Sequence, residues 1–150
     1  MSDRTTRGAV TVTAGAVTAL IGTFLPWLRS GARDRSSYAI FDLVERLGFA
    51  PDGPVAWSLR LWPLVPLVLV ALSVACWAVV TRHLGWRVAA SITGVGVVWV
   101  AGTSMALVLA PDVGLFRIGV GPTVTLVGVV VAGAGVVWLR PRRSAVSGGA

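Results

Sequence analysis

The stretch LWPLVPLVLVALSVACWAVV, residues 61–80, contains no charged side chain and is long enough to cross a lipid bilayer as a helix. A crossing needs roughly 20 apolar residues, and in lipid only a helix satisfies its backbone polar groups within one segment. Three further segments share this property, and none of them contains Asp, Glu, Lys, Arg or His: residues 8–28, 88–110 and 120–139. The pattern predicts an all-α fold, a bundle of four antiparallel transmembrane helices.

The composition supports this class of protein. Of 150 residues, 55 % are hydrophobic and 13 % are charged, with a mean hydropathy of +0.82. A soluble domain usually carries about 25 % charged residues. We expect one membrane domain over residues 1–150, with a large loop at 29–60 and a tail at 140–150.

The first segment has an alternative reading as a cleaved signal peptide. Arg4 and Arg7 resemble a basic leader region, and Ser30-Gly31-Ala32 resembles a cleavage site. The apolar run is longer than that of a usual signal peptide, however, and it ends in Pro26-Trp27, where an indole can anchor at the membrane surface. We therefore favour a retained helix.

The arginines indicate the orientation. With the N-terminus inside, the inner segments 1–7, 81–87 and 140–150 hold seven arginines and one acid, Asp3, a net charge of 7 − 1 = +6. The outer segments hold six arginines and five acids, a net charge of 6 − 5 = +1. Cytoplasmic loops are enriched in basic residues, so both termini are predicted to be cytoplasmic, in the plasma membrane.

Tryptophans follow the predicted crossings. Indole rings prefer the headgroup level, and six of the seven tryptophans fall near the segment ends. The predicted outer belt is Trp27, Trp57 and Trp62, and the predicted inner belt is Trp77, Trp86 and Trp138. Trp99 lies in mid-segment, where a packing role is favoured over a ligand-lining one.

The large loop contains an amphipathic stretch from Ser37 to Leu47, where apolar residues recur at helical spacing. Ser36 or Ser37 is a candidate N-cap and Gly48 a candidate C-cap. Acidic Asp42 precedes Arg46 by four residues, the favourable order for an ion pair on a helix. This helix either shields the top of the bundle or presents a docking surface, and the sequence leaves both open.

No catalytic, cofactor-binding or metal-binding motif is present. His83 is the only histidine and Cys76 the only cysteine, too few for a metal site or a nucleophile–base pair. Asp42 and Glu45, three apart, are better explained as solvated. A proton-coupled transporter needs ionisable groups inside its helices, and the predicted membrane segments contain none. They do contain Ser and Thr, whose hydroxyls can bond to the backbone one turn back. We expect no enzyme, no cofactor and no nucleic-acid partner.

Small residues four apart mark helix faces that can pack closely. They occur at Gly15-xxx-Ala19, Thr18-xxx-Gly22, Ala90-xxx-Gly94 and Gly128-xxx-Ala132. Packing inside the bundle and contact with a partner subunit are both open interpretations.

The strings FLPWLRSG (residues 24–31), RSSY (35–38) and RLG (46–48) carry a resemblance. They resemble small, mostly uncharacterised four-helix membrane proteins of mycobacteria and other actinobacteria. The resemblance covers the first helix and the large loop and transfers no catalytic residue. It implies an accessory subunit of an envelope complex, such as the Mce lipid-import machines.

The function predicted from these observations is a non-catalytic accessory or stabilising subunit of a larger cell-envelope complex, with larger membrane subunits and the lipid bilayer as its partners. The alternative is a small transporter or channel for a small or apolar solute. Aromatic residues and arginine anchor interfaces most often. The candidate partner-binding residues are Trp27, Arg29, Arg35, Tyr38, Phe41 and Arg46.

Overall fold

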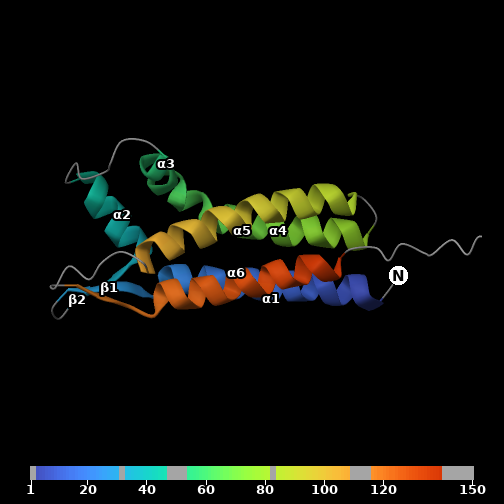
Figure 1. The fold of residues 1–150 in the computed structure, drawn as a ribbon, viewed down its shortest axis with the longest axis horizontal. Coiled ribbons are helices and arrows are strands. Elements are labelled where there is room, and N and C mark those ends of the chain that lie inside the picture. The colour runs from blue at the N-terminus through green and yellow to red at the C-terminus, as the bar shows by residue number, and fades with distance from the viewer. Residues whose placement is uncertain (1–2, 31–32, 47–53, 82–83, 109–115, 140–150) are drawn as a thin grey trace, which may run out of the picture.

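The computed structural model describes residues 3–30, 33–46, 54–81, 84–108 and 116–139. Four of the helices in these ranges are long and apolar enough to cross a membrane, as the sequence predicted. They lie side by side along the long axis of the molecule (Figure 1). Their bounds are α1 Asp3–Phe24, α4 Val65–Val80 with the preceding 3-10 turn η1 Trp62–Leu64, α5 Trp86–Val108 and α6 Gly121–Trp138.

The first helix is displaced toward the N-terminus relative to the predicted range 8–28. Its extra first turn is exposed, and Asp3 there forms an ion pair with Arg7 at 2.6 Å. It ends at Phe24 because Pro26 follows, and a proline disfavours the α conformation in the residue before it. Trp27, predicted to lie at the end of this helix, belongs instead to strand β1 (Pro26–Ser30).

Helices α1 and α6 pack with their backbones in contact. Glycine recurs every seven residues on both, at positions 8, 15 and 22 and at positions 121, 128 and 135. Seven residues are close to two full helical turns, so each set lies on one face. A Cβ atom on Gly15 would overlap backbone atoms of Gly128 and Ala132. Gly8, near the start of α1, lies beside Gly135, near the end of α6, so these two helices run in opposite directions.

The other helix contacts depend on side chains. Helix α4 lies against α1, and α5 lies against α4 and α6. Leu69 and Leu72 of α4 and Val100 of α5 are buried in the main core. Several hydroxyls inside the helices donate to backbone carbonyls one turn back, as predicted; Thr93 bonds to Ala89 at 2.8 Å, for example. The buried Ser104 hydroxyl on α5 is an exception and has no hydrogen-bond partner among the described residues.

A small three-stranded antiparallel sheet, which the sequence did not predict, adds to the mostly helical fold. It lies at the end of the bundle opposite the N-terminus (Figure 1). β1 is central, between β2 (Arg33–Ser36) and β3 (Phe116–Ile118). Leu28 pairs with Ile118, so the loop after α1 is hydrogen-bonded to the loop before α6. Strands of three to five residues are too short for their alternation to show beside long apolar runs.

Two short helices complete the same end. The amphipathic helix predicted from Ser37 to Leu47 is present as α2 (Ser37–Arg46). The predicted C-cap, Gly48, lies outside the described residues. A second helix, α3 (Pro54–Leu61), occupies the end of the region expected to be a large loop, and proline at its first position suits a helix start. We call this end, with the sheet, α2 and α3, the sheet end.

Candidate functional site

Four aromatic rings from four elements meet at the sheet end. Trp62 of η1 lies edge-on to Phe41 of α2, Trp27 of β1 and Trp99 of α5, with ring centroids 4.9, 5.2 and 6.5 Å apart. Trp27 and Trp62 are fully buried. Edge-to-face pairs contribute about 0.5–1.5 kcal/mol each beyond the burial of their area. This aromatic cluster therefore fixes the strand, the short helix and two membrane helices against one another.

Side-chain hydrogen bonds connect the cluster to the end of α1. Trp62 Nε1 donates to Ser37 Oγ at 3.0 Å, and Ser37 Oγ donates to the Thr23 carbonyl at 2.7 Å. Trp27 Nε1 donates to the Gly22 carbonyl at 2.8 Å. The last carbonyls of a helix lack partners within the helix, so these bonds cap α1. Ser37 was a candidate N-cap of α2, but its hydroxyl instead bonds to the Thr23 carbonyl and accepts from Trp62.

Two glycines that follow β3 leave the space that the Trp27 side chain and its backbone occupy. A Cβ atom on Gly121 would overlap the Trp27 indole, and one on Gly119 would overlap the Pro26 carbonyl. The Gly119 N–H donates to the Trp27 carbonyl at 2.9 Å. The start of α6 therefore holds the tryptophan that follows α1.

The structure separates the six predicted partner-binding residues into two groups. Trp27 is 0 % exposed and Phe41 8 % exposed, so neither offers surface to a partner. Burying their large apolar rings in the cluster is more favourable in free energy than exposing them to solvent. In the structure these two residues pack inside the aromatic cluster.

The other four predicted residues are at the surface or partly exposed. Arg29 and Arg46 are exposed, whereas Arg35 and Tyr38 are partly buried. The Tyr38 hydroxyl donates to Thr23 Oγ1 at 3.4 Å. These residues are on β1, β2 and α2, so the aromatic cluster beneath them fixes their backbones.

Two exposed ion pairs order this surface. Arg29 and Asp34 face each other across the β1–β2 ladder at 2.6 Å. The hydrogen bond from Arg29 lowers the pKa of Asp34 below its usual range, and the same bond raises the pKa of Arg29. The predicted Asp42–Arg46 pair is confirmed at 3.0 Å. Both carboxylates are thus occupied by arginine.

The described residues contain no cluster of three or more His, Cys, Asp or Glu side chains that could hold a metal ion. His83 lies outside the described residues. The described residues of the sheet end thus combine buried aromatic packing, capped helix carbonyls and acids paired with arginine. Comparison of the chain with protein-family models, with curated proteins and with solved structures finds no match.

Proposed function

We propose that this protein is a non-catalytic accessory or stabilising subunit of a larger membrane complex of the cell envelope, for example a lipid-import machine. The four helices span the plasma membrane as an antiparallel bundle, with both termini in the cytoplasm. The sheet end then lies outside and faces the partner. The observation that carries this proposal is the rigid support beneath Arg29, Arg35, Tyr38 and Arg46.

Rigidity matters for binding because immobilising side chains and loops costs free energy on association. Here the Trp62–Ser37–Thr23 chain of hydrogen bonds and the aromatic cluster already hold β1 and α2. A partner that docks on this surface therefore loses less conformational entropy.

The distribution of arginines supports the orientation. Arg4, Arg7 and Arg87 lie at the end of the bundle opposite the sheet, near the starts of α1 and α5 (Figure 1). Arg7 pairs with Asp3, whereas Arg4 and Arg87 have no carboxylate partner among the described residues. Net positive charge at one end favours placement of that end in the cytoplasm.

Affinity purification from native membranes in a mild detergent tests the proposal. We expect larger membrane subunits to co-purify in stoichiometric amount. Arg35→Ala and Tyr38→Ala should each reduce their recovery roughly fivefold or more, as interface anchors do. Arg60→Ala, an exposed arginine on α3, is the matched control and should leave recovery unchanged. Purification of a lone monomer or homo-oligomer would contradict the accessory role.

A groove between α1 and α4 favours one second candidate, a transporter of a small apolar solute. It has a volume of about 230 Å³ and is lined by Thr13, Ala16, Val17, Leu20, Leu69, Val70, Ser73 and Val74. Solute flux into liposomes that contain this protein alone would support transport and displace the accessory role.

A further inference from the structure

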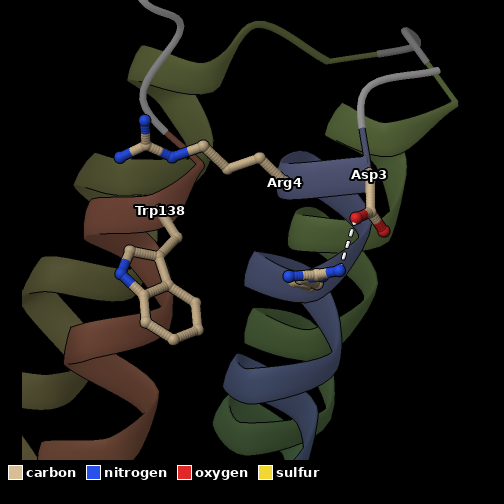
Figure 2. A pocket seen from close by; sticks show the side chains of 4 residues that line it. Asp3, Arg4 and Trp138 are labelled. Carbon is tan, nitrogen blue, oxygen red and sulfur yellow. Dashed lines mark ion pairs between the residues drawn. The ribbon is translucent and has the colours of Figure 1, made fainter.

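A pocket of about 450 Å³ opens at the end of the bundle opposite the sheet, between the first turn of α1 and the last turn of α6. Asp3, Arg4, Arg7 and Trp138 line it. Figure 2 shows the Arg4 side chain extending from α1 toward α6, with the Trp138 indole below its guanidinium. Cations and an aromatic ring from two membrane helices thus meet at one end of the bundle.

The charges in this pocket do not cancel. Arg7 pairs with Asp3 at 2.6 Å, and both side chains are largely exposed. Arg4 has no ion-pair partner among the described residues, so the two arginines and one acid leave a net charge of 2 − 1 = +1. A guanidinium presents a planar set of donors that suits a phosphate group. The pocket therefore favours an anion.

One turn further along α1 from Arg4, the helices α1 and α6 are in close contact. A Cβ atom on Gly8 would lie 3.0 Å from the Gly135 carbonyl oxygen and 3.1 Å from Leu139 Cγ. The backbones of α1 and α6 leave no passage between them here, so a ligand enters from the side or the end of the bundle.

The surface that continues from the pocket along both helices is apolar. On α6, Val131 and Val127 follow Trp138 at helical spacing and are 36 % and 52 % exposed. On α1, Thr11 and Thr18 follow Arg7, and both hydroxyls donate to backbone carbonyls of their own helix. What these threonines present outward is therefore mainly methyl groups.

We propose that this pocket binds the headgroup phosphate of an anionic phospholipid, in the leaflet reached by the N-terminus of α1. Arg4 and Arg7 contact the phosphate, Trp138 lies at headgroup depth, and an acyl chain follows the apolar strip of Thr11, Thr18, Val127 and Val131. Basic pockets between transmembrane helices are suited to anionic headgroups. A small soluble phosphate ester would leave the apolar strip unused.

Native mass spectrometry of the full chain, with phosphatidylglycerol and phosphatidylcholine added in equal amounts, tests this site. We expect one phosphatidylglycerol to be retained preferentially. Arg4→Gln should reduce its occupancy about fivefold, the value of one basic group near an anionic headgroup. Arg4→Lys should keep most of the binding. Asp3→Asn should strengthen binding, because it removes the carboxylate that occupies Arg7.

Arg87→Gln is the matched control, since Arg87 is an exposed arginine at the same end of the bundle but on α5. Equal retention of the two lipids, or an equal loss in R87Q and R4Q, would reduce the effect to general charge and overturn the proposal. Glycerol 1-phosphate provides a second arm. If it raises the melting temperature of the wild type but not of R4Q, the site takes a soluble phosphate ester, which also overturns the lipid assignment.

Discussion

Helix α1 packs against two of the other long helices, α6 and α4, in different ways. Against α6 its backbone is in direct contact, because Gly15 leaves no room for a Cβ atom beside Gly128. Against α4 the contact is made by side chains around a groove of about 230 Å³. Tryptophan hydrogen bonds also join these segments at two levels. Trp77, near the end of α4, donates to Thr13 in the middle of α1. Trp62 of η1 is linked through Ser37 to Thr23 near the end of α1.

The difference follows from the absence of a hydrophobic drive between helices in lipid. Association there depends on close van der Waals contact or on polar bonds. The α1–α6 pair uses backbone contact over its length, and the α1–α4 pair uses side-chain packing with hydrogen bonds at two levels. Of the two contacts, α1–α6 is therefore the more closely packed unit, and the α1–α4 contact is the looser one.

Gly15→Leu should have the largest effect. Its side chain would have to occupy space held by the backbone of α6, which separates the two helices. Overpacking a dense interface lowers the free energy of unfolding by about 1–3 kcal/mol. Because the leucine would meet backbone atoms, which cannot move aside as a side chain can, we expect a loss at or above the upper end of this range. Unfolding in mixed detergent and SDS, monitored by far-UV circular dichroism, measures the loss.

Gly94→Leu on α5 is the control, because nothing lies within 4 Å of a Cβ atom at that position. It should change the stability by less than about 0.5 kcal/mol. Equal losses for the two variants would show that a leucine side chain is unfavourable at either position for a reason other than the α1–α6 contact, because leucine has a higher helix propensity than glycine.

Ser37→Ala should have an intermediate effect on the end of α1. It leaves the buried Trp62 N–H and the Thr23 carbonyl without their partner, at a cost of about 1–3 kcal/mol for unpaired groups. The indole fluorescence of the aromatic cluster should also shift as Trp62 loosens. Ser36→Ala changes the neighbouring, partly exposed hydroxyl and should be nearly neutral. If S36A destabilises as much as S37A, the hydrogen-bond chain does not hold this end.

Most of the helical framework could be predicted from the sequence, because membrane crossings are encoded by composition over about 20 residues. The amphipathic helix α2 could be predicted from the helical spacing of its apolar residues. The α1–α6 contact was indicated by two of the predicted small-residue pairs, Gly15-xxx-Ala19 and Gly128-xxx-Ala132, because Gly15 meets Gly128 and Ala132, and Gly128 meets Ala19. The seven-residue spacing of glycine extends the same two faces along both helices.

The aromatic cluster was hidden for a physical reason. The preference of indole for headgroups gives the depth of a tryptophan but not the direction in which it points. Trp57 and Trp138 are 65 % and 48 % exposed, as belt residues would be, while Trp62 at a similar predicted depth is fully buried. Its direction depends on Ser37, which is 25 residues away in the chain. Such long-range partners leave no local periodicity.

The smallest expected effect concerns the outermost contact of the α1–α6 unit, where β1 extends α1 into the sheet. Because Arg29 holds the pKa of Asp34 below its usual value of 3.8, the pair stabilises the fold above that pH and loses its contribution as the pH falls through the lowered pKa. Both groups are solvent-exposed, so salt should weaken the effect further. Carboxyl NMR of Asp34 in wild type and Arg29→Gln measures it, and we expect the pKa to rise toward 3.8 in the variant. An unchanged Asp34 pKa in R29Q would mean that the pair does not persist in solution, and that the β1–β2 ladder rests on its backbone bonds alone.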